Sequence, residues 1–544
     1  MTSSTGGEAI VSGLVAHGVD TVFGLPGAQI YGLFDAFQQA QLKVIGARHE
    51  QACGYMAFGY ARSSGKTGVF SVVPGPGVLN AGAALLTAFG SNEPVLCLTG
   101  QVPTAFLGKG RGHLHEMPDQ LATLRTFVKW ADRIEYPDDA PSKVSRAFQE
   151  MHSGRPGPVA LEMPWDVFTQ RAEVGPATPF DPLPAPLPDP DRIKAAASLI
   201  AASKTPMIFV GSGAIDAREE ILELAELIDA PVVAFRSGRG IVSNAHELGL
   251  TMAAAYKLWP QTDLMIGIGT RLELPTMSRW PFRPDGLKSI RIDIDASEMR
   301  RFTPDAAVIS DAKAGTADLL AAVRKLGYGK TRGRRAAIRE ASAAALQEIQ
   351  TIQPQMAYLN ILREVLPLDA IVTDELSQFG FASWYGFPIY KPRTFITSGY
   401  QGTLGSGFPT ALGAKVAHPD RPVVAITGDG GFMFGVQELA TAVQFNIGVV
   451  TLVFNNNAYG NVRRDQRERF DGRVVAADLV NPDFVKLAES FGVGAARVTS
   501  PQEFRPALEK ALADGGPYLI AIEVPRDSEV SPWKFIHPAR PADA

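Results

Sequence analysis

The segment VVAITGDGG at residues 423–431, followed by NNN at residues 455–457, decides the expected fold. Residues 423–427 form a short apolar run that predicts a buried strand, and residues 448–454 predict a second one. Between them, apolar residues at helical spacing predict a helix over residues 435–446. These elements make a βαβ unit, whose right-handed crossover lays the two strands parallel. Both strands therefore end at the same edge of one sheet, where ligands of such sheets bind.

Two polar side chains, Asp429 and Asn456, are expected to face each other across that edge. A carboxylate, an amide oxygen and a free backbone carbonyl suit Mg²⁺, which takes few protein ligands and completes its shell with phosphate and water. Gly430 and Gly431 carry no side chain, so backbone N–H groups can approach an anion at the start of the next helix. The pattern therefore predicts a site for a metal ion and a diphosphate.

The GDG motif at residues 428–430, a gap of about two dozen residues and the closing NN resemble the cofactor signature of thiamine-diphosphate enzymes. The surrounding sequence resembles the acetolactate synthase, pyruvate oxidase and benzoylformate decarboxylase group over nearly the whole chain. The resemblance implies thiamine diphosphate and Mg²⁺ as cofactors, with Asp429, Asn456 and the carbonyl of Ala458 as metal ligands. The alternative is a plain glycine turn with asparagines that cap a strand end, and the independent matches below weigh against it.

The length and composition of the chain limit the number of domains, the kinds of partner and the cellular location that can be expected. A chain of 544 residues is too long for one core, so roughly three domains are expected. A net charge of -4 and 46% hydrophobic residues argue against a nucleic-acid or membrane partner. Cys53 and Cys97 are the only cysteines, which fits a reducing compartment. No secretory signal or membrane-spanning run is apparent, so the expected location is cytoplasmic.

Two segments of unusual composition divide the chain. A proline-rich run at residues 175–190 is expected to be extended, and a basic, alanine-rich run at residues 327–353 is expected to begin as a charged loop and end as a solvated helix. The blocks between them alternate β-branched runs with amphipathic helices, the pattern of doubly wound parallel sheets. The predicted fold is therefore α/β with three parallel-sheet domains. With the names that the resemblance supplies, these are a pyrimidine-binding domain (1–172), a central Rossmann-like domain (190–326), a diphosphate-binding domain (354–526) and a tail (527–544).

Glu50 follows a predicted strand at residues 43–47 and lies at the start of a predicted helix at residues 49–62. The turn RHEQA at residues 48–52 resembles the family turn whose glutamate hydrogen-bonds N1′ of the cofactor's aminopyrimidine. That role needs a carboxylate shielded from water, so burial and a raised pKa are expected. The alternative is a carboxylate favoured at a helix N-terminus by the helix dipole, which the other motif matches weigh against.

By resemblance, the loops at residues 23–27, 74–77 and 108–120 lie on the substrate side, with Gly27 and Val73 as expected substrate contacts. For the first two loops, ordinary turns at strand ends are an equal alternative. His115 stands where acetolactate synthases carry an active-site glutamine. A histidine titrates near neutrality and could act as an acid or base, while a plain surface histidine is the equal alternative. Val73 stands where benzoylformate decarboxylases carry a catalytic histidine, so their proton relay is absent.

The central block has glycine-rich turns at residues 211–213 and 267–271, but neither completes a dinucleotide fingerprint. In acetolactate synthases and pyruvate oxidases this domain binds FAD. Here LELP at residues 272–275 replaces the acidic-then-arginine run of acetolactate synthases, whose arginine selects the second keto acid. FAD is therefore not favoured. Arg236 and Arg239 either bind an anionic group or are solvated.

In the C-terminal block, TSGYQGTLG at residues 397–405 resembles the loop that holds the pyrimidine. Leu404 stands where the family wedges an apolar side chain between the two cofactor rings, which brings base and proton together. Ordinary core packing is the alternative. Arg463 and Arg464 are expected to be solvated rather than substrate-binding, and the tail either covers the site or packs on the surface. The resemblance also assigns cofactor contacts to Ser377, Gln378, Gly402, Gly430, Gly431, Tyr459 and Gly460, and substrate contact to Val462.

These features predict a thiamine-diphosphate- and Mg²⁺-dependent enzyme that cleaves or forms a carbon–carbon bond next to a carbonyl. An acetolactate-synthase-like carboligase acting on 2-oxo acids, with a 2-oxo acid or an aldehyde as acceptor, is the leading form. A 2-oxo-acid decarboxylase, a C–C hydrolase, an FAD-dependent oxidase of the pyruvate oxidase kind and a cofactor-binding protein without catalysis are the alternatives. Because Glu50 and the metal site lie in different blocks and meet between subunits in the resembled family, a homodimer or homotetramer with interfacial active sites is expected.

Overall fold

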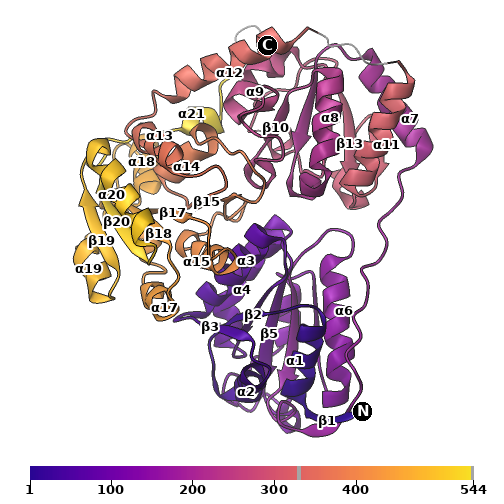
Figure 1. Ribbon diagram of the computed structural model, residues 1–544, viewed down its shortest axis with the longest axis vertical. Coiled ribbons are helices and arrows are strands. Elements are labelled where there is room, and N and C mark those ends of the chain that lie inside the picture. Colours follow the sequence, from indigo (N-terminus) through magenta and orange to yellow (C-terminus); the bar gives the residue numbers. More distant parts are fainter. Residues whose placement is uncertain (278, 328–332, 541–544) are drawn as a thin grey trace.

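The computed structural model describes residues 1–277, 279–327 and 333–540. It contains three six-stranded sheets, all parallel, and one small two-stranded sheet. The three sheets form separate lobes along the chain, with the N-terminal lobe at the bottom of Figure 1, the central lobe above it and the C-terminal lobe beside both. The predicted class, α/β with three parallel-sheet domains, is confirmed.

The N-terminal sheet has the strand order β3-β2-β4-β5-β7-β6. Helices α3 (Glu50–Ser64) and α4 (Pro76–Ser91) share one hydrophobic core with the C-terminal domain. A two-stranded antiparallel sheet of β1 (Thr2–Thr5) and β8 (Arg171–Val174), which the sequence patterns do not predict, ties the first residues to the end of this domain. The other elements are β2 (Thr21–Gly24), α1 (Gly6–Ala16), α2 (Tyr31–Gln39), β3 (Lys43–Gly46), β4 (Gly68–Val72), β5 (Val95–Gln101), α5 (Gln120–Arg125), β6 (Trp130–Arg133), α6 (Ala140–His152) and β7 (Val159–Pro164).

The central sheet has the order β11-β10-β9-β12-β13-β14. The proline-rich run before it contains no helix or strand until α7 begins at Pro190, as expected. The helix expected to be solvated, α12 (Arg335–Ile349), instead buries Ile338, Ala341 and Ala345 and packs on α9 (Met252–Leu258), while residues 328–332 of the expected charged loop lie outside the described residues. The remaining elements are α7 (Pro190–Ala202), β9 (Pro206–Val210), α8 (Arg218–Ile228), β10 (Val232–Ala234), β11 (Gly249–Leu250), β12 (Leu264–Ile268), α10 (Glu273–Thr276), β13 (Lys288–Asp293), β14 (Ala306–Ile309) and α11 (Ala312–Lys325).

The C-terminal sheet has the order β16-β15-β17-β18-β20-β19. The two strands of the opening motif, β17 (Val423–Gly428) and β18 (Val450–Asn455), are neighbours and parallel. The helix expected at residues 435–446 is shorter, α17 (Glu438–Gln444), and a separate short helix, α16 (Asp429–Phe432), precedes it. The other elements are α13 (Gln355–Val365), β15 (Ile371–Thr373), α14 (Gln378–Gly386), β16 (Phe395–Ile396), α15 (Gly407–Ala417), α18 (Gly460–Arg469), α19 (Phe484–Ser490), β19 (Gly494–Val498), α20 (Pro501–Asp514), β20 (Tyr518–Glu523) and α21 (Trp533–Ile536).

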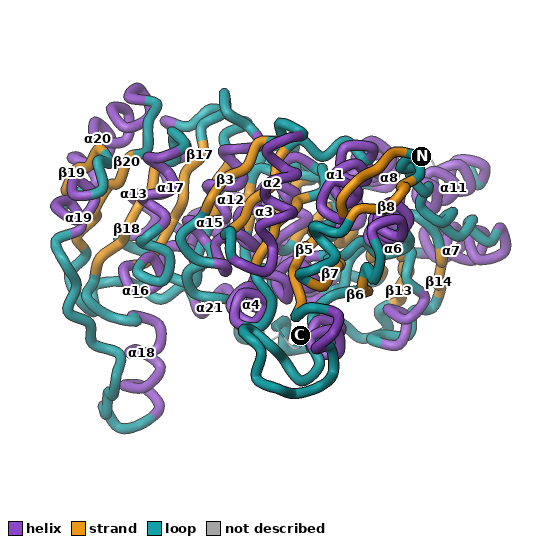
Figure 2. Tube along the Cα trace, turned by 90° about the horizontal axis from the view of Figure 1, so that it is seen from below, coloured by secondary structure: helices purple, strands orange, loops and turns teal. Residues whose placement is uncertain are grey.

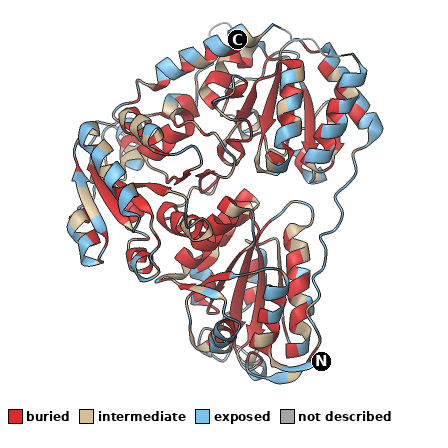
Figure 3. Cartoon of the chain, in the orientation of Figure 1, coloured by how far each residue is buried: buried red, intermediate tan, exposed pale blue. Residues whose placement is uncertain are grey.

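The N-terminal and C-terminal domains meet at the antiparallel contact of α3 with α15, in a junction filled by buried residues (Figure 3). Glycines permit the close approach: a Cβ at Gly59 would lie 2.0 Å from the carbonyl oxygen of Thr410, and a Cβ at Gly413 would lie 1.9 Å from that of Met56. The helix that carries Glu50 is therefore fixed against the cofactor domain of its own chain.

None of the helices in the described part of the chain has the length and apolar character that a bilayer crossing requires.

Candidate functional site

The predicted metal ligands lie together at the edge where β17 and β18 end. Asp429 begins α16 directly after β17 and is 3% exposed. Its Oδ2 accepts hydrogen bonds from Nδ2 of Asn481 at 2.7 Å and from the backbone N–H of Ala458 at 3.2 Å. The same N–H reaches Oδ1 of Asn456 at 3.0 Å. Burial raises the pKa of Asp429, and no basic side chain among the described residues offsets this effect. This set of buried oxygen donors fits a divalent metal ion such as Mg²⁺.

Three glycines leave bare backbone around this cluster. A Cβ at Gly430 would lie 2.4 Å from the ring of Tyr459, one at Gly431 would lie 2.2 Å from Oε2 of Glu375, and one at Gly460 would lie 2.7 Å from Nδ2 of Asn456. No side chain fits at these positions without displacing a neighbour. The arrangement suits a diphosphate, which backbone N–H groups bind at the start of a helix.

The residues that follow β15 lie close to the same cluster. Ser377 caps α14, and its hydroxyl accepts a hydrogen bond from the N–H of Gly380 at 3.1 Å. Gln378 shares a cavity of about 140 Å³ with Asn456, Ala458 and Gly460. Its Oε1 is buried and has no hydrogen-bond partner among the described residues. Gln378 thus lies near the cluster and keeps one buried polar atom unpaired within the described residues.

Glu375 connects two of the predicted cofactor loops. Its side chain is 2% exposed, it accepts a short hydrogen bond from the N–H of Gly405, and it lies against Gly431. Burial raises the pKa of Glu375 to about 8. Glu375 was not predicted as a site residue, although it comes two residues after the buried strand β15 (Ile371–Thr373) and so resembles Asp429, which follows β17.

The loop expected to hold the pyrimidine turns at two glycines with left-handed backbone conformations. Gly402 and Gly405 have φ values of +60° and +79°, which glycine adopts without strain. Leu404 is half-buried rather than part of the core. Ordinary core packing, the alternative explanation for Leu404, is therefore disfavoured.

Glu50 begins α3 and accepts a hydrogen bond from Nδ2 of Asn80 on α4 at 3.0 Å. Its carboxylate is only half-buried, so the expected burial is not found within one chain. In the described part of the chain no hydrogen bond or ion pair links Glu50 to the Asp429 cluster. The turn before Glu50 instead contacts α17, where the N–H of Arg48 donates to Glu438 at 3.1 Å.

The three predicted substrate-side positions of the N-terminal domain lie on three loops that contact one another. A Cβ at Gly27 would lie 2.3 Å from Cγ1 of Val73, and one at Gly75 would lie 2.6 Å from the carbonyl oxygen of His115. The N–H of Gly75 also donates to Oε1 of Gln120 at 2.8 Å. His115 is half-buried with φ +63°, so it is a constrained loop residue rather than a freely exposed one.

Arg463 and Arg464 on α18 were expected to be solvated, but both are held by contacts within the protein. Arg463 pairs with Asp478 at 2.7 Å and with Asp527 at 2.6 Å. Arg464 is 9% exposed, and its guanidinium lies 5.0 Å from the ring of Trp533 in the tail. The tail thus packs against α18, which projects from the body of the C-terminal domain (Figure 2). Val462, on the same helix, is half exposed.

The central domain has a cavity of about 520 Å³ at its glycine turns. A Cβ at Gly211 would lie 2.4 Å from the carbonyl oxygen of Gly269, so the two turns touch. Asp293, at the end of β13, lines the cavity, and burial raises its pKa to about 6. Arg271 donates to the carbonyl of Gly90 at 2.5 Å, which anchors the cavity to the N-terminal domain.

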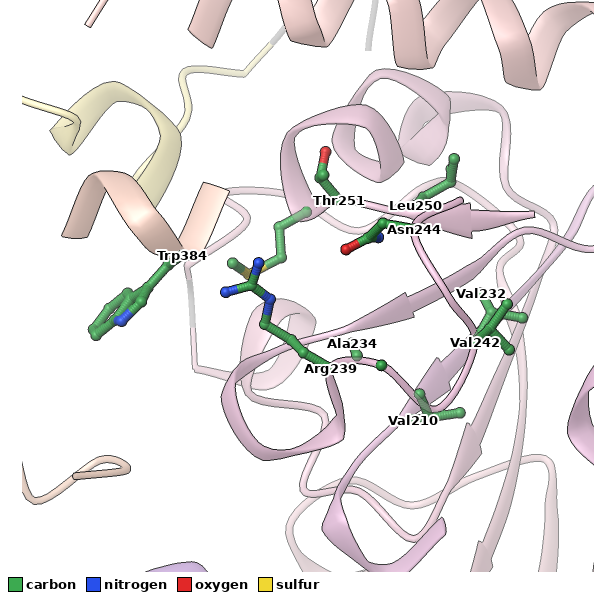
Figure 4. A pocket seen from close by; sticks show the side chains of 11 residues that line it. Val210, Val232, Ala234, Arg239, Val242, Asn244, Leu250, Thr251 and Trp384 are labelled. Carbon is green, nitrogen blue, oxygen red and sulfur yellow. The ribbon is translucent and has the colours of Figure 1, made fainter. Parts of the chain in front are cut away.

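Arg236 and Arg239 are both buried, which excludes the solvated alternative. Arg236 lines the large cavity, and its backbone has the left-handed φ value of +52°. Arg239 donates to the carbonyls of Ser383, at 3.1 Å, and Phe387. It lies beside Trp384 at a second cavity of about 10 Å³, room for one water molecule (Figure 4). Arg239 therefore joins the central and C-terminal domains.

Comparison with known proteins agrees with this architecture. The thiamine pyrophosphate enzyme family matches in three parts: its N-terminal TPP binding domain over residues 4–123, its central domain over residues 193–320 and its C-terminal TPP binding domain over residues 376–522. The chain belongs to the thiamine pyrophosphate enzyme family, and it is a thiamine-pyrophosphate-dependent enzyme of the acetolactate synthase, pyruvate oxidase and benzoylformate decarboxylase group.

Several curated relatives are similar over nearly their whole length. A probable acetolactate synthase large subunit of Methanocaldococcus jannaschii is 36% identical over 95% of this chain and 92% of its own. The probable 2-ketoarginine decarboxylase AruI of Pseudomonas aeruginosa is 32% identical over 95% of this chain and 94% of its own. The large subunit of acetolactate synthase isozyme 1 of Escherichia coli K12 is 30% identical over 97% of this chain and 95% of its own.

Proposed function

We propose that this protein is a thiamine-diphosphate- and Mg²⁺-dependent enzyme that breaks and forms carbon–carbon bonds next to the carbonyl of a 2-oxo acid, with carboligation as the leading outcome. The observation that carries the proposal is the buried cluster of Asp429, Asn456 and Ala458 beside the bare backbone of Gly430 and Gly431. These residues would hold Mg²⁺ and the diphosphate. The relatives named as acetolactate synthases support carboligation.

When bound, thiamine diphosphate supplies a thiazolium ring that accepts the electron pair released when a bond next to a carbonyl breaks. The chain's own residues prepare this chemistry. Glu50 would share a proton with N1′ of the pyrimidine, and the amide of Asn80 holds its carboxylate in place. Leu404 would support the bent shape of the cofactor. The Gly27, Val73 and His115 surface would shape the substrate side.

We also propose that each active site needs two chains, in a homodimer or homotetramer. The Glu50 half-site and the Asp429 half-site have no connecting hydrogen bond or ion pair within the described residues of one protomer. Large apolar side chains are exposed beside both halves: Leu79, next to Asn80, is 56% exposed, and Phe434, which faces Gly405, is 50% exposed. A second chain docked over both half-sites would cover these side chains.

We propose that the enzyme prefers a neutral aldehyde as acceptor, or a 2-oxo acid other than pyruvate as donor. An anionic acceptor needs a desolvated cation opposite its carboxylate. Arg271 is committed to the Gly90 carbonyl and to the ring of Tyr400, 5.0 Å away, and the next residue is the buried Leu272. A 2-oxo-acid decarboxylase is the second candidate, because the AruI relative is named a probable decarboxylase.

FAD remains an unfavoured alternative for the large central cavity. The glycine turns and Asp293 suit the phosphates and ribose of a nucleotide, but the sequence lacks the complete fingerprint. The absorbance spectrum of the purified protein shows whether FAD is bound, because a bound flavin gives a yellow protein with a flavin absorbance band.

Incubation of the holoenzyme with a panel of 2-oxo acids, with and without aldehydes, tests the proposed reaction by mass spectrometry of the products. We expect a carboligation product with an aldehyde acceptor, poor acetolactate formation from pyruvate alone, and a changed product ratio in His115→Gln. Efficient conversion of pyruvate to acetolactate, unaffected by His115→Gln, would show that the acceptor proposal is wrong. Release of aldehyde without any carboligation would favour the decarboxylase.

A further inference from the structure

A carboxylate of the C-terminal tail contacts a predicted metal ligand. Oε2 of Glu529 accepts a hydrogen bond from Nδ2 of Asn456 at 2.6 Å. An amide side chain has one end that donates and one that accepts, and only its oxygen binds a metal ion. A carboxylate accepts hydrogen bonds, so it selects the nitrogen end of Asn456. Oδ1 of Asn456 consequently points to the other side, where it shares the Ala458 N–H with Asp429.

Glu529 has no competing basic partner among the described residues, although arginines surround it. Arg463 and Arg467 pair with Asp527 at 2.6 Å and 3.1 Å, and Arg526 pairs with Asp478 at 3.2 Å. Glu529 shares its cavity with these arginines but forms none of their ion pairs. Its carboxylate is therefore available to the amide of Asn456.

The tail around Glu529 is held on several sides, so this contact is fixed by the fold. The N–H of Val530 donates to the carbonyl of Gln353 at 2.9 Å. Its carbonyl accepts from Nε2 of the buried Gln355 at 2.8 Å. Ser531 accepts a short hydrogen bond from Arg464, and Trp533 stacks edge-on against Phe381 with ring centroids 5.6 Å apart.

We propose that Glu529 is a positioning residue that orients Asn456 for metal binding and makes the C-terminal tail part of the metal centre. This inference rests on the proposed function, since it assumes that Asn456 is a metal ligand. Partners that orient a metal ligand typically change metal affinity by about 10- to 100-fold. By linkage, a metal ion that binds better when the tail is docked must also stabilise the docked tail.

Metal affinity is the direct test. Mn²⁺ prefers oxygen ligands as Mg²⁺ does, and electron paramagnetic resonance measures its free concentration during titration of the full-length protein with thiamine diphosphate present. We expect Glu529→Ala to weaken Mn²⁺ binding by about 10- to 100-fold. Glu529→Gln keeps an oxygen for the Asn456 N–H and should recover most of the affinity. Glu489→Gln, which removes an exposed carboxylate on α19, should leave the affinity unchanged.

Asp429→Ala separates this proposal from the proposed function. If wild type binds Mn²⁺ no better than Asp429→Ala, the metal site itself is wrong. If Asp429→Ala loses binding but Glu529→Ala matches wild type, only the positioning role is overturned. Equal losses in Glu529→Ala and Glu529→Gln would also overturn it, because the hydrogen bond would then not matter. Circular dichroism confirms that each variant is folded.

Trypsin cleavage in the tail gives a readout that is independent of activity and of metal titration. Arg526 lies just before Glu529 and is accessible, with a side chain 39% exposed. We expect Mn²⁺ with thiamine diphosphate to slow cleavage after Arg526 in wild type and to have little effect in Glu529→Ala. A wild-type tail whose cleavage rate is insensitive to the metal would contradict the link between tail docking and metal binding.

Discussion

At the scale of single residues, buried carboxylates mark the chemistry of this chain. Asp429 and Glu375 are each nearly inaccessible to water and have raised pKa values because burial disfavours their charged forms. Asp429 lies among oxygen donors, which suits a cation. Glu375 lies among backbone N–H groups of the predicted cofactor loop, and no basic side chain among the described residues pairs with it. Glu50 differs, since it is half-buried in one protomer and is held by Asn80.

We predict that Glu50→Gln binds the cofactor normally but is slow in activating it. The oxygen of the new amide could still accept the hydrogen bond from Asn80, so the local structure should survive. An amide cannot exchange a proton with N1′, and loss of a positioned acid/base costs about 10²- to 10⁴-fold in rate. Exchange of the cofactor's C2 proton into D₂O, measured by quenched-flow NMR, reports this step. An unchanged exchange rate would refute the role of Glu50.

Glu375 gives a prediction for pH dependence. Its pKa in the folded protein is about 8, against an ordinary value of 4.5, so the folded state holds a proton that the unfolded state loses. The free energy of unfolding therefore falls as the pH rises from about 4.5 to about 8. Glu375→Gln removes this titration and can keep the contact with Gly405. We expect its melting temperature relative to wild type to rise between about pH 5 and about pH 8. A difference that is constant across this range would contradict the assignment.

At the scale of helices and strands, local sequence patterns predict the elements but not the contacts between them. The strands β17 and β18 lie close to their predicted positions because a run of buried apolar residues is a local signal. The helix expected at residues 435–446 starts later because the preceding loop packs on the cofactor loop: a Cβ at Gly405 would lie 2.4 Å from Cβ of Phe434. Such a contact between distant segments leaves no trace in local periodicity.

The same limit applies to the site. The proximity of Asp429, Asn456 and the glycines could be predicted, because these residues belong to the GDG and NN sequence motif. No sequence motif identifies Arg464 or Glu529. Arg464 is buried by its contact with Trp533, and the proposed role of Glu529 depends on its contact with Asn456, and both partners are distant in sequence. The charge run of α18 suggested a solvated helix, since the sequence alone does not show that the tail covers it. Glu375 could have been predicted from its place after β15.

The packing of α3 on α15 gives a prediction at this scale. A Cβ at Gly413 would lie 1.9 Å from the carbonyl oxygen of Met56, which belongs to the backbone and cannot move aside alone. We expect Gly413→Ala to lower the free energy of unfolding by about 1–3 kcal/mol in denaturant titrations. Gly82→Ala on α4 is the matched control. Its Cβ would meet nothing closer than Phe127 at 3.8 Å, so it should be neutral or stabilising by up to about 1 kcal/mol. Equal effects of the two changes would contradict the close-packing explanation.

At the scale of the whole molecule, the three domains, each built on a six-stranded parallel sheet, have different proposed roles. The first and third domains carry the two proposed half-sites, and the central domain contacts both through Arg271 and Arg239. Because α3 is packed firmly on α15 of its own chain, a flexible hinge is not available to bring Glu50 to Asp429. A second copy of the chain is the natural source of the missing half.

Mixing two inactive variants tests this assembly. Glu50→Gln and Asp429→Ala each damage one half-site, so a heterodimer contains one site with two intact halves and one with none. We expect dissociation and reassociation of the mixture to restore a fraction of the wild-type activity. Heterodimers that form, as native mass spectrometry would show, but remain inactive would contradict a shared site.

The central claim is that Asp429 and its neighbours bind a metal ion that retains the diphosphate. Calorimetric titration of wild type and Asp429→Ala with thiamine diphosphate, with Mg²⁺ and with a chelator, tests it most directly. Loss of a charged partner in a buried site costs about 3–5 kcal/mol, so we predict that binding weakens by at least roughly 100-fold in Asp429→Ala and in chelated wild type. Binding by Asp429→Ala that is as tight as wild type would contradict the claim.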